Sequence, residues 1–197
     1  MNAADMSDPV GRVIEWIAAA RERGERDAQA ATLATVDPAS ARPSVRTVYV
    51  QTDADTLVFF VNANTGKGQH LRWHPHAALC FFWRELQQQI NIEGVAEVLD
   101  NADADRLWAQ RQRDSQLSAR SSAQEAIFGD IEAFRQRRER EHDAYSFEQV
   151  PRPEHWIGYR LLPTRIEFWA AGWHRLRPRE LFERDPDGGW QEADQEP

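Results

Sequence analysis

Apolar residues recur at helical spacing in the first part of the chain and at the spacing of strands later. At residues 7–9, a Ser-Asp-Pro run combines a capping side chain with a proline suited to a first helical turn. Apolar residues at positions 10, 13, 14 and 17 then fall on one helical face. The pattern predicts an N-terminal helix that ends in the charged run "RERGERD".

Runs rich in β-branched and aromatic residues, separated by turn-forming residues, predict strands in the remainder of the chain. Gly94 lies in the middle of the fifth run, where a glycine indicates a bulge or the close approach of another backbone. The last run is followed by the turn-forming segment "DPDGG". The predicted strands cover residues 31–36, 44–51, 56–62, 77–83, 89–99, 156–162, 165–170 and 180–184.

Helices are expected between some of these strands. "ANTGKGQHLRWHP" predicts a loop that runs into a short helix, which ends at the His-Pro pair because a residue before proline avoids helical backbone. Residues 101–110 are expected to form a second helix. A third should begin at Ser122, which fits a capping box with Glu125 three residues later.

Short strands therefore dominate, and the helices are inserted rather than alternating regularly with them. This favours a mainly β (α+β) fold, an antiparallel β-barrel with peripheral helices, over a doubly wound parallel sheet. The length of 197 residues suits a single domain. We expect an N-terminal helical segment at residues 1–28 and a barrel with inserted helices at residues 29–197.

Composition and charge narrow the function classes. A net charge of −8 argues against a general nucleic-acid binder, and no apolar run approaches the roughly 20 residues that span a bilayer. Cys80 is the only cysteine, so neither an intrachain disulfide nor a cysteine-based metal site is possible. The N-terminus lacks the features of a secretory signal, and the expected compartment is the cytoplasm.

Metal and nucleophile chemistry find little support. His70, His74 and His76 have a spacing that could hold a metal, but no further ligand is evident, and surface histidines are the better interpretation. Cys80 lies in an apolar run where a thiolate would be disfavoured. Lys67, in the glycine-rich segment "TGKGQ", could hold a phosphate together with backbone N–H groups, although such a segment is more often only a turn.

Arginines gather near an indole in the C-terminal segment "IEFWAAGWHRLRPRE". Arginine suits bidentate recognition of phosphate or carboxylate. Further cations lie at Arg46, within a predicted strand, and at Arg111, near the hydroxyl of Ser115. Each alone is best read as a solvated surface residue. Together with Trp169 they indicate a local site for a phosphorylated aromatic ring.

Six segments in order resemble the pyridoxamine 5′-phosphate oxidase family, FMN-dependent enzymes with a split-barrel flavoprotein fold. They are "RTVYVQ", "FFVNANTGKGQHLRWHPHAALCFFW", "QQQINIEGVAE", "RQRDSQLSARSSAQ", "HWIGYRL" and "IEFWAAGWHRLRPR". The resemblance covers about residues 31–190. It implies an FMN-binding split barrel and a homodimer with FMN at the subunit interface.

Carried over position by position, the resemblance implies a cofactor site for FMN. Arg46 and Lys67 would hold the FMN phosphate, and Phe60 and Val61 would contact the cofactor largely through their backbone. The remaining implied cofactor residues, which would hydrogen-bond the flavin or complete its site, are Gln89, Gln124, Trp169 and Arg179.

The resemblance also implies a substrate site. Arg111 and Ser115 match positions that bind the substrate phosphate, and Arg175 matches the catalytic arginine placed over the reacting carbon. Gln51 and Arg177 occupy further substrate positions. The implied reaction oxidises pyridoxamine or pyridoxine 5′-phosphate to pyridoxal 5′-phosphate, while O₂ is reduced to H₂O₂.

Several positions depart from the family pattern. On the substrate side, Gln51 stands for a lysine, Leu107 for a tyrosine and Arg177 for a histidine. On the cofactor side, Gly66 stands for an arginine and Glu125 for a serine. Two alternatives follow: a divergent FMN-dependent oxidase acting on another planar ring, such as a phenazine-like substrate, or a non-catalytic flavin-, haem- or deazaflavin-binding protein on the same barrel.

Overall fold

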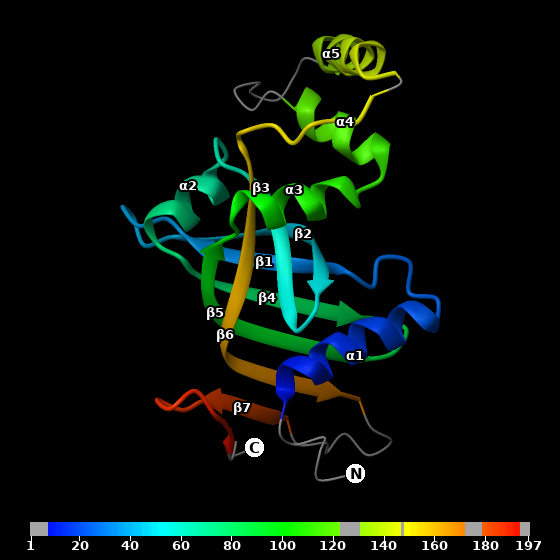
Figure 1. The fold of residues 1–197 in the computed structure, drawn as a ribbon. Helices are drawn as coiled ribbons and strands as arrows, with labels where there is room; N and C mark the ends of the chain where they lie inside the picture. Colours follow the sequence, from blue (N-terminus) through cyan, green and yellow to red (C-terminus); the bar gives the residue numbers. More distant parts are fainter. Residues whose placement is uncertain (1–7, 123–130, 147, 172–178, 194–197) are drawn as a thin grey trace. The chain divides into compact units, whose positions relative to one another are not determined.

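A computed structural model describes residues 8–122, 131–146, 148–171 and 179–193 of the chain. Within these ranges the chain forms strands and helices in mixed order (Figure 1). The elements are α1 (Pro9–Glu22), β1 (Ala30–Val36), β2 (Pro43–Asp53), β3 (Thr56–Asn62), α2 (Gly66–Trp73), β4 (His76–Trp83), β5 (Gln88–Val98), α3 (Asn101–Ala109), α4 (Arg113–Ser121), α5 (Ile131–Ala144), β6 (Trp156–Ala170), β7 (Glu180–Arg184) and β8 (Trp190–Ala193).

Six of the strands form a closed antiparallel barrel, which confirms the predicted fold class. The strand order is β3-β2-β1-β4-β5-β6-β7-β8, and an additional β3–β6 pairing closes the first six strands on themselves. β7 and β8 extend the sheet beyond β6 as a hairpin. Closure leaves the six barrel strands without a free edge that could pair with other chains.

Side chains alternate between the inside and the outside of the barrel. On β2, Val48 and Val50 are buried, whereas Val45 and Tyr49 are exposed. This period of two is what a strand with one buried face requires. The largest fully buried side chains of the barrel strands are Leu33, Leu57, Phe59, Leu79, Phe81, Ile90, Ile92, Leu161, Ile166 and Phe168.

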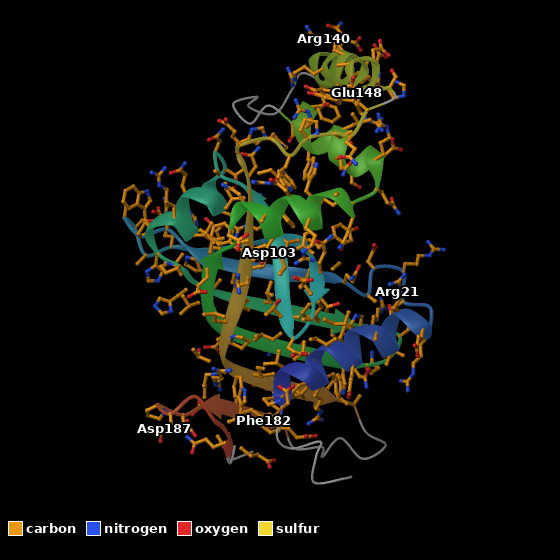
Figure 2. All side chains as sticks on the ribbon, in the orientation of Figure 1. Arg21, Asp103, Arg140, Glu148, Phe182 and Asp187 are labelled. Carbon is orange, nitrogen blue, oxygen red and sulfur yellow. The ribbon has the colours of Figure 1, made fainter. Side chains whose placement is uncertain are left out.

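The first helix lies against β6, near its end (blue beside orange in Figure 1). Asp8 caps α1 by accepting a hydrogen bond from the Val10 N–H at 3.1 Å, as the Ser-Asp-Pro run predicts. The Arg12 guanidinium lies 4.2 Å from the centre of the Phe168 ring. Phe168 also meets Phe182 of β7, labelled in Figure 2, in an edge-to-face contact with ring centres 6.0 Å apart.

β6 is one continuous strand, so the prediction of two separate strands at residues 156–162 and 165–170 is wrong. The strand continues through Pro163. The prediction for Gly94 is confirmed and extended, because a Cβ at this position would collide with the Leu162 carbonyl and lie 3.0 Å from the Pro163 Cα. The glycine therefore lets β5 approach the backbone of β6 more closely than any side chain would allow.

Two elements were not predicted. β8 follows the expected turn, in which Gly188 adopts a φ of +88°. α4 occupies residues where the sequence indicated the end of a helix, and Ser122 lies at its C-terminal cap and donates to the Ala119 carbonyl at 2.8 Å. The capping box expected to start a helix at Ser122 involves Glu125, which is outside the described residues.

The chain divides into two compact units. The barrel unit comprises residues 1–59, 70–97 and 160–197, and the helical unit comprises residues 60–69 and 98–159. The helical unit has a core of its own, in which Trp108, Leu117 and Val150 are buried. None of the described helices is long and apolar enough to cross a membrane.

Candidate active site

Arg46 is held at one end of the inward face of β2. Its Nη1 donates to the Thr35 Oγ1 at 2.7 Å and to the Leu33 carbonyl at 3.2 Å, and its Nη2 donates to the Ser44 Oγ at 2.6 Å. Burial lowers the pKa of the Arg46 guanidinium, because desolvation disfavours its charged form. The neighbouring oxygens offset part of that cost and fix the plane of the group.

Two glutamines predicted for the site lie on different strands of the barrel unit. Gln51 is half-buried on β2, opposite Val58 of β3, and its Oε1 is buried without a hydrogen-bond partner among the described residues. Gln89 is half-buried on β5, opposite Phe82 of β4. Within the described ranges, neither side-chain amide makes a hydrogen bond that would prevent it from contacting a ligand.

Near the end of β6, Trp169 is half-buried and Glu167 is buried. The Glu167 Oε1 accepts hydrogen bonds from the Arg179 Nη1 at 2.6 Å and from the Asn91 Nδ2 at 3.2 Å. Arg179 is thereby tied by an ion pair to the strand that carries Trp169. The sequence resemblance named Trp169 and Arg179, but it missed Glu167 and Asn91, which orient Arg179.

In the helical unit, Arg111 lies near two indole rings that also meet edge-to-face, with ring centres 6.2 Å apart. Its guanidinium carbon is 5.8 Å from the ring centre of Trp108 and 5.4 Å from that of Trp156. Burial lowers the pKa of Arg111. Its Nε is buried without a hydrogen-bond partner in the described part of the chain, and the same holds for the Trp156 Nε1. Unpaired buried donors are costly, so the Arg111 Nε–H is suited to receive an anion.

The other predicted residues of the helical unit lie on three elements. Ser115 is half-buried in the first turn of α4, four residues beyond Arg111. Lys67 is half-buried near the start of α2. Phe60 and Val61 are buried on β3, so only their backbone groups are suited to contact a cofactor, as the resemblance implies.

Three predicted residues, Gln124, Arg175 and Arg177, lie outside the described residues. The structure therefore does not place Arg175, the predicted catalytic arginine, or Arg177, which stands where the family has a histidine. Within the described ranges, further buried donors that the sequence did not reveal are the Asn62 Nδ2 and the His155 Nε2. No sequence pattern could have found them, because their lack of partners depends on the packing around them.

Cys80 and the histidines do not form a competing catalytic centre. Burial, together with the charge of Glu167, raises the pKa of the Cys80 thiol, which agrees with the expectation that a thiolate is disfavoured there. His70 is bonded to Thr35, and the rings of His74 and His76 are 5.1 Å apart. Among the described residues, no group of three or more metal-binding side chains comes together.

Comparison with known proteins gives this arrangement a family. Residues 18–144 match the family model described as pyridoxamine 5′-phosphate oxidase, and residues 156–194 match the pyridoxine 5′-phosphate oxidase C-terminal dimerisation region. The chain belongs to the pyridoxamine 5′-phosphate oxidase family. It is accordingly an oxidoreductase, and the resemblance found in the sequence is confirmed.

Relatives of this family resemble the chain over most of its length. The pyridoxine/pyridoxamine 5′-phosphate oxidase of Sphingopyxis alaskensis is 40% identical over 189 residues, which cover 95% of this chain and 87% of the relative. The enzyme of the same name from Myxococcus xanthus is 39% identical over 93% of this chain and 88% of its own. The match thus includes nearly all of both proteins.

A solved structure with a different bound compound is also similar to the chain. PhzG from Burkholderia lata 383, in complex with tetrahydrophenazine-1-carboxylic acid, superimposes with a TM-score of 0.87. It is 32% identical and covers 97% of this chain and 93% of its own.

Arg46, expected to hold the FMN phosphate, suits that role chemically. Its guanidinium is oriented by three oxygens. A site for a phosphorylated ring needs such preformed cationic and N–H donors. The ion pair between Arg179 and Glu167 adds a second arginine whose position is set by the fold.

Proposed function

We propose that this protein is an FMN-dependent oxidase that converts pyridoxamine or pyridoxine 5′-phosphate to pyridoxal 5′-phosphate. The observation that carries the proposal is the half-buried Arg111, whose buried Nε has no partner among the described residues and whose guanidinium lies near the rings of Trp108 and Trp156. Family membership and about 40% identity to enzymes named for this reaction support it.

The substrate phosphate is assigned to Arg111 and Ser115. The indole faces hold the guanidinium by cation–π contact without using its N–H groups. The donors of Arg111 therefore remain available for two phosphate oxygens, with the Ser115 hydroxyl in the first turn of α4 as a further donor. The dipole of that helix also favours an anion near its N-terminus.

The FMN phosphate is assigned to Arg46, and Lys67 is proposed as a second cation for it. Trp169 and Arg179 are proposed to contact the flavin, with Phe60, Val61, Gln89 and Gln124 as further cofactor residues. Arg175, outside the described residues, is proposed as the cation over the reacting carbon. The protein's task is to bind and orient, because the cofactor carries the redox chemistry.

When bound, FMN would accept a hydride from C4′ of the substrate and return the two electrons to O₂ as H₂O₂. Pyridoxine phosphate and O₂ then give pyridoxal phosphate and H₂O₂. Pyridoxamine phosphate, O₂ and water give pyridoxal phosphate, ammonia and H₂O₂. Fixed positive charge from arginines would stabilise negative charge on the phosphate and near the ring.

A second candidate is oxidation of a planar ring without a phosphate, related to the compound bound by PhzG. Leu107 stands where the family has a tyrosine, and a leucine has no hydroxyl to donate. It is only 1% exposed, so its side chain is packed in the core of the helical unit. Gln51 is neutral where a lysine is usual, and its buried Oε1 has no partner among the described residues. Both features reduce the donors available to a substrate phosphate.

Peroxide formation separates the two candidates. Purified protein loaded with FMN is supplied with pyridoxine phosphate, pyridoxamine phosphate or a dihydrophenazine carboxylic acid, and H₂O₂ is measured with and without Arg111→Ala. Turnover of the phosphorylated substrates that depends on Arg111 supports the first candidate. Turnover of the phenazine alone supports the second, and a colourless protein that takes up no FMN would support the non-catalytic alternative.

A homodimer is proposed on the match to the dimerisation region and on an exposed apolar face of the barrel unit. Val45, Tyr49 and Phe82 point outward and are 65%, 60% and 53% exposed. Large exposed apolar side chains mark interaction surfaces when they gather on one face. Light scattering should give twice the chain mass, and Val45→Glu should shift the protein toward the monomer.

A further inference from the structure

Thr35 lies at the centre of a hydrogen-bond chain that ends on the Arg46 guanidinium. It is 1% exposed on β1, opposite Ser44 of β2. Its Oγ1 is 2.7 Å from the Arg46 Nη1 and 3.0 Å from the Nδ1 of His70 on α2. All three residues belong to the barrel unit. The chain of contacts therefore joins the side chain of a helix to a cation on a strand.

The chemistry of the three groups fixes the direction of these hydrogen bonds. A guanidinium can only donate, so the Thr35 oxygen accepts from Arg46. The Thr35 proton is sealed from water and needs an acceptor, because a buried unpaired hydroxyl is costly. The His70 Nδ1 supplies a lone pair at 3.0 Å when the ring is neutral and carries its proton on Nε2.

The contacts of Arg46 leave one edge of its guanidinium available. Both N–H groups of Nη1 are used, by Thr35 and by the Leu33 carbonyl, and one N–H of Nη2 is used by Ser44. The Nε–H and the second Nη2–H make no hydrogen bond within the described ranges. In a guanidinium, the Nε–H and the Nη2–H beside it are parallel, and together they match two oxygens of one phosphate.

We propose that Thr35 and His70 are positioning residues that hold Arg46 with its Nε/Nη2 edge presented to the FMN phosphate. They contribute to the preference for FMN over riboflavin, which lacks the phosphate, without touching the cofactor themselves. This inference rests on the proposed FMN-dependent function. It assigns a role to two residues that the family resemblance left unassigned.

The first test compares two substitutions at Thr35. Thr35→Val keeps the shape of the side chain but removes the oxygen, whereas Thr35→Ser keeps the oxygen. Dissociation constants for FMN and for riboflavin are measured by quenching of flavin fluorescence. Thr35→Val is expected to weaken FMN binding about ten-fold, the effect of one hydrogen bond to a charged group, and to leave riboflavin binding unchanged. Thr35→Ser should restore the wild-type ratio.

A second pair of variants tests His70, whose half-buried position on α2 makes substitution easier for the fold to accept. His70→Asn places a carbonyl oxygen close to the position of Nδ1, and His70→Leu removes the acceptor. We expect His70→Leu to reduce the FMN-to-riboflavin preference by about three-fold, the lower end of the effect of a lost hydrogen bond. His70→Asn should stay near the wild type.

A measurement on the apo-protein does not depend on the cofactor. Nitrogen NMR of the His70 ring should show a neutral ring with the proton on Nε2, and Thr35→Val should change the Nδ1 resonance. A wild-type protein that binds FMN no better than riboflavin overturns the proposed role of Arg46. If the wild type prefers FMN over riboflavin and this preference is unchanged in Thr35→Val and His70→Leu, the positioning role is overturned, whereas the role of Arg46 stands.

Discussion

The barrel unit and the helical unit each hold a half-buried arginine, but they hold it in opposite ways. Arg46 in the barrel donates three hydrogen bonds to oxygens of β1 and β2. Arg111 in the helical unit lies against the faces of Trp108 and Trp156, and its buried Nε has no partner among the described residues. Burial lowers the pKa of both.

The difference separates two ways of preparing a cation for a phosphate. Hydrogen bonds fix the plane of Arg46 and leave one edge free, so little rotational freedom is lost when an anion binds. Indole faces hold Arg111 by its π-surface and keep its donors unpaired, which costs stability until an anion arrives. Arg46 is thus preorganised to bind an anion. Binding of an anion to Arg111 would relieve the cost of its unpaired donors.

The largest expected effect is at Arg46. Arg46→Ala should weaken FMN binding by about 100-fold or more, because two charge-assisted hydrogen bonds to the phosphate are lost. Arg46→Lys should recover only part of this, since an ammonium lacks the planar fork that the three oxygens orient. Fluorescence titration measures both values. Equal FMN affinity in Arg46→Ala and wild type would remove Arg46 from the cofactor site.

The next largest effect is expected at Arg111, on the substrate rather than on FMN. Arg111→Ala should raise the KM for pyridoxine phosphate by about 10- to 100-fold, as expected for lost hydrogen bonds to a charged group. FMN affinity should not change. Arg113→Ala is a suitable control, because Arg113 in the same segment donates to the carbonyls of Tyr145 and Glu148 instead (Figure 2 labels Glu148). A similar rise in KM for both variants would contradict a specific role for Arg111.

A smaller effect of opposite sign is expected at Trp156. Trp156→Phe keeps an aromatic face for Arg111 but removes the buried Nε1–H that has no partner among the described residues. The free energy of unfolding should stay level or rise by up to about 1 kcal/mol, because an unsatisfied donor is removed while a small cavity is created. Urea denaturation measures this. A loss of more than about 2 kcal/mol would mean that the indole N–H is satisfied in solution.

The smallest effect is expected in the turn after β1, where the contact is exposed. The Ser40 hydroxyl and the Ala39 N–H lower the pKa of Asp37 by hydrogen-bonding its carboxylate. Because the pKa of Asp37 is lower in the folded protein than in the unfolded chain, its carboxylate stabilises the fold at pH values above the unfolded-state pKa. This stabilisation is lost as the pH falls through the folded-state pKa. Ser40→Ala should raise the Asp37 pKa toward its ordinary value, as followed by NMR. An unchanged pKa would show that the Ala39 N–H alone holds the carboxylate.

Local patterns predicted most of the barrel, because its strands are runs of β-branched and aromatic residues separated by turn-forming residues, and its first helix carries its own cap. These patterns failed where the local structure depends on residues that are distant in the sequence. β6 was expected to break near Pro163, yet it continues, and the reason Gly94 is needed became visible only with its partner at Leu162. α4 was missed because Gln112 makes no side-chain cap and the helix has few apolar positions.

The candidate site was predictable in its cations but not in what surrounds them. Arg46 and Arg111 stand out in the sequence by residue type and by resemblance. Thr35, which orients Arg46, is an ordinary strand residue, and Trp156 was recognised only as part of a matching segment. Their roles depend on which side chains meet across strands and helices, which periodicity and spacing do not encode.

One consequence follows from the way the chain divides. The helical unit is assembled from two stretches, residues 60–69 and 98–159, separated by a stretch that belongs to the barrel. The Ala63 N–H donates to the His155 carbonyl at 2.7 Å, and the Phe60 ring packs against Gly158. Residues 60–69 are therefore hydrogen-bonded to and packed against the longer stretch. A protein fragment of residues 98–159 would lack the contacts with residues 60–69. Any contiguous piece that holds the whole unit carrying Arg111 must therefore also include residues 70–97 of the barrel unit.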